Sequence, residues 1–213
     1  MNKEKFEKIM EKFKEMYPNV EISLNYNSAF ELVVCLILAA QCTDKRVNEV
    51  TKNIFDKYNT PEDFSNMDIQ LLQQLIKPCG FYINKAKNIQ KASKQIIDNF
   101  NGIVPDNMDD LQTLAGIGRK SANCILSDFF HNPQGVAIDT HAKRICNRLG
   151  ISSQSNPLKI EQDLLKIADK KHWQNLNLIL VTHGRKTCKA FSPLCNECKL
   201  NNLCKYYTEE KNT

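Results

Sequence analysis

Residues 111–141 contain side chains whose types and spacing suit the binding of an anionic group. Gly116 and Gly118 stand between two helical patterns, so the backbone can turn tightly there without a Cβ in the way. Arg119 and Lys120 follow at once, in the first turn of the second helix. The free N–H groups and the positive dipole end of a helix N-terminus attract a phosphate, whereas two cations placed there need an anionic partner. The segment predicts a phosphate-gripping hairpin.

A dinucleotide-binding loop is the alternative for the same residues. The stretch Gly-Ile-Gly-Arg-Lys-Ser comes close to the Gly-x-Gly-x-x-Gly fingerprint. That fingerprint requires a preceding strand, and residues 109–115 have a helical pattern instead. We therefore favour a hairpin between two helices.

Four cysteines near the C-terminus form a second group, Cys188, Cys195, Cys198 and Cys204. Four thiolates within seventeen residues can close around one metal centre. Structural zinc usually takes two Cys-x-x-Cys-type pairs, and only one pair here has that spacing. A [4Fe–4S] cluster accepts more varied spacings. Spacing alone favours iron–sulfur over zinc, and separate free thiols are the third alternative.

The elements that must position these groups are helical almost throughout, so the predicted fold class is all-α. Apolar residues recur at helical spacing from Phe6 onward. Ser28 to Glu31 has a capping-box pattern before the longest apolar run, which is too short to span a bilayer. Asp139 is predicted to cap a helix that ends before Gly150, and the last helix is predicted to end near Arg185. The other cysteines mostly fall within helical patterns and are expected to be buried and structural: Cys35, Cys42, Cys79, Cys124 and Cys146.

Composition places the chain among ordinary globular proteins. Its 213 residues are 42% hydrophobic and 25% charged, with a net charge of +5. Residues 134–213 hold 13 Lys and Arg against 7 Asp and Glu, so the positive excess lies in this part of the chain. Such asymmetry is typical of a protein with a polyanionic partner, and a solvated basic face would give the same distribution of charge. The N-terminus lacks the apolar segment of an export signal, so we expect a cytoplasmic protein with reduced or metal-bound thiols.

The hairpin, Lys120, the segment of residues 136–141 and the four-cysteine tail occur in an order and spacing that resembles the endonuclease III family of helix–hairpin–helix DNA glycosylases. The resemblance covers essentially the whole chain. It implies two all-α domains with DNA in the cleft between them. One would be a six-helix barrel of residues 22–133. The other would be a discontinuous domain, residues 1–21 and 134–213, holding a [4Fe–4S] cluster on the four tail cysteines.

The resemblance also implies an activity and a partner. Members remove oxidised pyrimidines from double-stranded DNA and nick the strand at the abasic site. By position, Lys120 would be the nucleophile that forms a Schiff base with the opened sugar, and Asp139 its carboxylate helper. An amine must lose its proton to attack, and Asp139 could accept that proton and stabilise positive charge on the deoxyribose. We expect a monomer with no membrane association.

Further positions match residues that contact DNA in the family. Gln41 would fill the gap left by the flipped nucleotide, and Phe81 stands where a leucine wedge is common. The hairpin residues Gly116, Gly118 and Arg119 would contact the DNA backbone.

Besides Phe81, two positions and one segment depart from the family pattern, and two other functions stay open. Ala115 replaces a proline, Ala39 replaces a serine, and residues 189–194 are less basic than in relatives. A monofunctional adenine-mismatch glycosylase is one alternative, but those enzymes typically lack a lysine at the position of Lys120. A non-catalytic iron–sulfur protein that binds DNA is the other, and the presence of both Lys120 and Asp139 argues against it.

Overall fold

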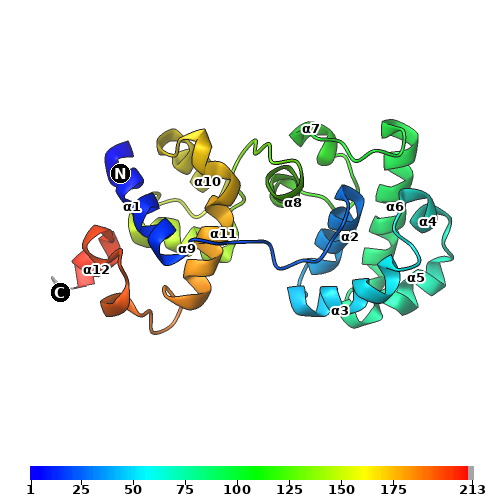
Figure 1. Ribbon diagram of the computed structural model, residues 1–213, viewed down its shortest axis with the longest axis horizontal. Helices are drawn as coiled ribbons and strands as arrows, with labels where there is room; N and C mark the ends of the chain where they lie inside the picture. Colours follow the sequence, from blue (N-terminus) through cyan, green and yellow to red (C-terminus); the bar gives the residue numbers. More distant parts are fainter. Residues whose placement is uncertain (211–213) are drawn as a thin grey trace. The chain divides into compact units, whose positions relative to one another are not determined.

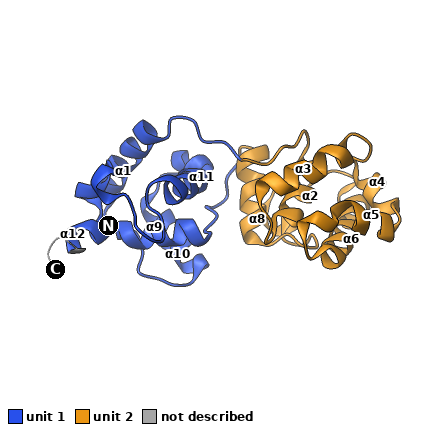
Figure 2. Cartoon of the chain, turned by 90° about the horizontal axis from the view of Figure 1, so that it is seen from below, with its two compact units in different colours: residues 1–22, 132–213 blue, residues 23–131 orange. Residues whose placement is uncertain are grey.

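The computed structural model describes residues 1–210, and every regular element in that range is a helix (Figure 1). The predicted all-α fold class is therefore confirmed. The chain divides into two compact units (Figure 2): one comprises residues 1–22 and 132–213, the other residues 23–131. The ranges expected from the sequence were 1–21 with 134–213, whose last three residues lie outside the described part, and 22–133. No described helix is both long and apolar enough to cross a membrane.

The continuous unit, residues 23–131, is organised around the apolar helix α2. Leu32, Val33 and Leu38 of this helix are fully buried. The long helix α6 packs against α2, α4 and α5. In chain order the elements are α2 (Ala29–Ala39), α3 (Asp44–Phe55), α4 (Pro61–Asn66), α5 (Ile69–Ile76), the 3₁₀ turn η1 (Lys77–Cys79), α6 (Tyr82–Phe100), α7 (Met108–Leu111), α8 (Arg119–Cys124) and the π-helix η2 (Ile125–Phe129).

The start of α2 differs in one detail from the predicted capping box. The Ser28 hydroxyl accepts a hydrogen bond from the Glu31 backbone N–H at 3.1 Å, as expected. The Glu31 carboxylate, however, accepts from the backbone N–H of Asn27 rather than from that of Ser28. The Glu31 carboxylate therefore binds the backbone N–H of the residue before Ser28. The bond from the Ser28 N–H to Glu31, which would complete a capping box, is not formed.

The discontinuous unit combines the N-terminal helix with the C-terminal third of the chain. Phe6, Ile9 and Phe13 of the first helix lie in the same core as Ile145 and Leu180. Its elements are α1 (Lys3–Met16), α9 (Thr140–Leu149), α10 (Pro157–Ile167), α11 (Lys170–Lys186), the 3₁₀ turns η3 (Cys195–Glu197) and η4 (Asn201–Leu203), and α12 (Lys205–Glu210). Helix α11 ends at Lys186, next to the predicted Arg185, but the expectation that it is the last helix was wrong, because η3, η4 and α12 follow it.

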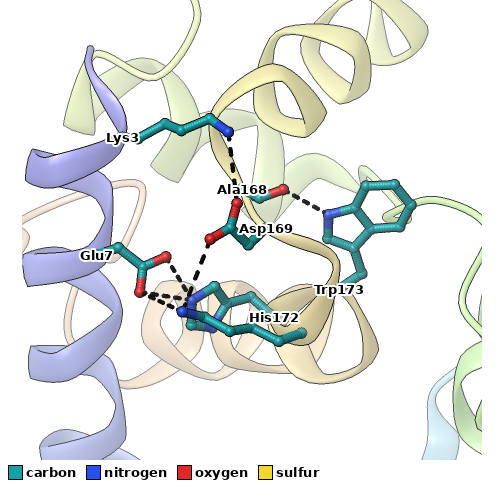
Figure 3. A network of polar contacts seen from close by, with 7 residues as sticks. Lys3, Glu7, Ala168, Asp169, His172 and Trp173 are labelled. Atoms are coloured by element: carbon teal, nitrogen blue, oxygen red, sulfur yellow. Dashed lines mark hydrogen bonds and ion pairs between the residues drawn. The ribbon is translucent and has the colours of Figure 1, made fainter.

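Polar contacts fasten α1 to the start of α11 (Figure 3). The Glu7 carboxylate lies 2.9 Å from Nε2 of the buried His172 and 3.1 Å from Nζ of Lys171. Partial burial works against ionisation of Glu7, but these two partners outweigh it and lower its pKa. Lys3 pairs with Asp169 at 3.6 Å on the same side. The N-terminal helix is thus held to a segment more than 160 residues away by charge as well as by its apolar face.

Candidate functional site

The predicted hairpin is present between α7 and α8, and its two glycines differ in what they require. Gly116 has a left-handed φ of +82°, and a Cβ there would lie 3.2 Å from side-chain atoms of both Asn88 and Ile37. Gly116 therefore needs to be glycine for two independent reasons. Gly118 has an ordinary φ of −96°, and no described atom lies within 4 Å of its Cβ position. The turn itself therefore requires glycine at position 116 and not at position 118.

A side chain of α6, Gln95, holds the hairpin at its entry. Its Oε1 accepts from the Ala115 backbone N–H at 2.8 Å, and its Nε2 donates to the Thr113 carbonyl at 2.8 Å. Proline at position 115 would have no N–H to donate. The alanine that departs from the family pattern is thus used here for a hydrogen bond, and the sequence contained no local signal for Gln95.

Arg119 and Lys120 open α8, as predicted. The Lys120 side chain is exposed, whereas Arg119 is half-buried. Two residues further on, Ala122 and Asn123 are buried and anchor the helix in the core of its unit. The helix continues directly into the π-helix η2. An exposed amine on a helix that is anchored in the core is a suitable arrangement for a nucleophile that must reach a macromolecule.

Gln41 and Phe81 share an unusual backbone conformation. Their φ values are +54° and +48°, in the left-handed region that bulky side chains rarely occupy. Both side chains are exposed, and Phe81 keeps 64% of its surface accessible. Backbone strain at an exposed aromatic residue is characteristic of positions kept for a function. The two residues lie in the same unit, at the ends of α2 and η1 respectively.

Asp139 caps α9, as predicted. Its Oδ1 accepts from the Ala142 backbone N–H at 2.7 Å. The strand-like segment before it is fixed on both sides, because Glu161 accepts from the Val136 N–H at 3.1 Å and Asn177 donates to the Ala137 carbonyl at 2.7 Å. Asp139 belongs to the discontinuous unit and Lys120 to the continuous one.

The four tail cysteines line one pocket of about 380 Å³ that includes space open to solvent. Its walls contain the apolar side chains of Ile145, Leu149 and Leu200. Within the described residues, no three or more His, Cys, Asp or Glu side chains are grouped closely enough to hold a single metal ion. The four thiols share the lining of this one pocket.

Cationic and polar groups surround this thiol pocket. Arg148 donates from Nη1 to Cys188 Sγ at 3.2 Å and from the same atom to the Lys189 carbonyl at 2.7 Å. Burial, and then the neighbouring thiols, raise the pKa of Cys198. Burial, with the Arg144 guanidinium adding to it, lowers the pKa of His183 to about 4, so its ring is neutral beside the pocket.

Known proteins of similar sequence and structure share this arrangement of helices. Residues 34–170 match the HhH-GPD superfamily base excision DNA repair proteins. Endonuclease III of Bacillus subtilis is 44% identical over 206 residues, covering 96% of the chain and 94% of the relative. A non-covalent endonuclease III–DNA complex has a TM-score of 0.91 at 37% identity, over 100% of both chains. A trapped endonuclease III–DNA covalent intermediate has a TM-score of 0.92 at 38% identity, over 99% of both chains.

Such identity along nearly the full length of a relative, with the same helical fold, indicates common descent rather than a shared architecture alone. The chain belongs to the endonuclease III family of base-excision-repair DNA glycosylases and abasic-site lyases.

Proposed function

We propose that this glycosylase and lyase acts on oxidised pyrimidines in double-stranded DNA, with Lys120 as nucleophile and Asp139 as its carboxylate helper. The observation that carries the proposal is the exposed Lys120 at the start of α8, directly behind the hairpin that Gly116 shapes. The relative with a trapped covalent bond to DNA supports a chemistry in which the protein itself attacks the nucleotide.

The reaction begins once the target nucleotide has left the base stack, because its C1′ is shielded inside the duplex. Nζ of Lys120 forms a bond to C1′ while the bond between C1′ and the base breaks. Asp139 takes a proton from the amine and faces the positive charge that develops on the sugar. The base leaves with the electrons of the broken bond and takes a proton from solvent. The sugar ring then opens to a protonated Schiff base as the proton held by Asp139 passes to O4′, and β-elimination removes a proton from C2′ and breaks the bond between C3′ and its phosphate oxygen, so that the phosphate leaves.

Binding to DNA is assigned to the hairpin and to the two exposed, strained residues. The N–H groups after Gly116 and the side chain of Arg119 suit contacts to the phosphate backbone. Gln41 and Phe81 suit entry into the stack, since one can hydrogen-bond to a base and the other can stack on one. Two similar structures are complexes with DNA, which supports this assignment.

The thiol pocket fits a [4Fe–4S] cluster better than zinc. A cubane offers a separate iron to each thiolate, whereas four zinc ligands converge on one ion. Four cysteines that line one pocket with apolar walls, and Arg148 hydrogen-bonded to Cys188, are compatible with the first case. Bound there, the cluster would supply a crosslink among Cys188, Cys195, Cys198 and Cys204. The segment that these residues span has few apolar side chains to hold it otherwise.

Borohydride trapping tests the proposed mechanism. Incubation with duplex DNA containing thymine glycol should give an imine, and its reduction should leave a stable protein–DNA adduct on a denaturing gel. Lys120→Gln should abolish adduct and nicking while duplex binding persists, because one charge among many contributes little to affinity. Base release without an adduct would mean a monofunctional glycosylase, and neither product would mean a non-catalytic DNA-binding protein. An adduct with Lys120→Gln would assign the chemistry to another amine.

A further inference from the structure

Lys85, on α6, is a buried cation without an acidic partner. Its side chain is 4% exposed. Its Nζ donates to the Leu38 carbonyl at 2.7 Å and to the Cys79 carbonyl at 2.8 Å. Among residues 1–210, no Asp or Glu forms an ion pair with it. A lone charge held by two carbonyls deep in a helical unit requires a reason, because its removal from water is costly.

The two carbonyls that bind Lys85 belong to the segments that precede the two strained, exposed residues. Leu38 lies in the last turn of α2, three residues before Gln41. Cys79 ends η1, two residues before Phe81. One ammonium group on α6 therefore binds a backbone carbonyl of each segment. The Leu38 carbonyl is also one of the unpaired carbonyls at a helix C-terminus, where a cation is favourable.

One other side-chain contact joins these two segments, a hydrogen bond between the Cys42 and Cys79 thiols, and the backbone bonds in them are local. The Cys42 N–H returns to the Ala39 carbonyl at 3.1 Å, and the Gly80 N–H returns to the Lys77 carbonyl at 3.2 Å. Each of these bonds closes a turn within its own segment and does not join the two segments. Burial lowers the pKa of Lys85, partly offset by the nearby Cys42 and Cys79 thiols. The ammonium links the two segments directly, through a single atom.

We infer that Lys85 is a positioning residue, which sets the spacing between Gln41 and Phe81 so that both enter the duplex together and extrude the target nucleotide. The inference rests on the proposed function. Two residues that probe one base stack must match its geometry, and a displacement of about 1 Å at such a site can reduce a rate on the order of a hundredfold. A rigid link between their two supports provides that match.

The test compares Lys85→Met with Lys91→Met. Methionine has a similar length but lacks the charge and the donors, and Lys91 is an exposed lysine on the same helix. Each variant is assayed on a thymine glycol duplex and on the same duplex with a preformed abasic site, which has no base to unpair. Lys85→Met should slow base excision at least tenfold more than it slows strand cleavage at the abasic site. The signal of a 2-aminopurine placed beside the lesion should fall in parallel. Lys91→Met should match the wild type in every assay.

A triple variant compared with a double variant separates positioning from simple destabilisation. If Lys85 acts through the two probing residues, Lys85→Met combined with Gln41→Ala and Phe81→Ala should be no slower than Gln41→Ala with Phe81→Ala alone. Lys85→Arg, which keeps the charge and the donors, should restore part of the rate. Additive losses, or equal losses on both substrates with a lower unfolding temperature, would overturn the inference. If the wild type itself cleaves nothing, the proposed function fails, while the 2-aminopurine signal still tests Lys85.

Discussion

At Asp139 a structural role and a chemical role share one carboxylate. Its Oδ1 is taken up by the cap of α9, and a carboxylate has a second oxygen that can face a substrate. Capping α9 and assisting Lys120 are therefore compatible roles for the one carboxylate. The two roles differ in their demand, because a cap needs an oxygen and the chemistry needs a negative charge.

Two substitutions at Asp139 separate these roles. Asn caps a helix as well as Asp does, so Asp139→Asn should leave the unfolding temperature nearly unchanged and slow base excision about 10²–10⁴-fold. Asp139→Ala should be as slow and should also lose about 1 kcal/mol of stability with the cap. Single-turnover excision and thermal unfolding measure the two effects. An Asn variant with the wild-type rate would remove Asp139 from the mechanism.

Ala115 offers a second test at the level of one residue. Proline there should destabilise the wild type by about 1 kcal/mol, because it removes the N–H that Gln95 accepts. In a Gln95→Ala background that bond is already absent, so Ala115→Pro should cost much less or become stabilising. Denaturant unfolding of the four proteins gives the coupling. Equal effects of proline in both backgrounds would show that the Gln95 bond contributes nothing.

At the scale of elements, the two hairpin glycines allow the effects on folding and on DNA binding to be measured separately. Gly116→Ala should destabilise the protein by about 1–2 kcal/mol, because its φ is left-handed and its Cβ would press on Asn88 and Ile37. Gly118→Ala should leave stability unchanged, since its Cβ meets open space. If a phosphate approaches Gly118, the same alanine should weaken DNA affinity about equally on all sequences. Unfolding curves and binding titrations at several salt concentrations check both, and normal DNA binding by Gly118→Ala would remove it from the interface.

The helices could be predicted from the sequence wherever caps and apolar spacing agreed. Asp139 and Gly150 bracket α9 as expected, and Gly150 takes the left-handed conformation. The elements after Cys188 could not be predicted, because η3 and η4 are 3₁₀ turns of three residues and α12 has only six residues, too few for an apolar period. Gln95 and Lys85 were also missed. Each binds backbone groups that are distant in sequence, and such bonds leave no local pattern. The tail cysteines were identified by spacing alone and line one pocket in the structure, while their role as cluster ligands stays a prediction.

For the whole molecule, the central prediction concerns the bound metal. Anaerobically purified protein should be brown and contain about four iron and four sulfide per chain. Removal of the iron by a chelator should loosen the discontinuous unit, whose core includes Leu200 between the cysteines. Residues 23–131 have their own core and should stay helical. Metal analysis and hydrogen exchange measure these outcomes, and stoichiometric zinc without sulfide would contradict the cluster.

The interrupted unit has a consequence for how the chain matures on the ribosome. Helix α1 is synthesised before the residues it packs against, because Ile145, Leu176 and Leu180 come more than 130 residues later. Translation at about 5–20 residues per second puts roughly 8–30 s between them. During that interval residues 23–131 can complete their own core, while Phe6, Ile9 and Phe13 stay uncovered and available to a chaperone. Helix α1 is therefore buried long after it has been synthesised.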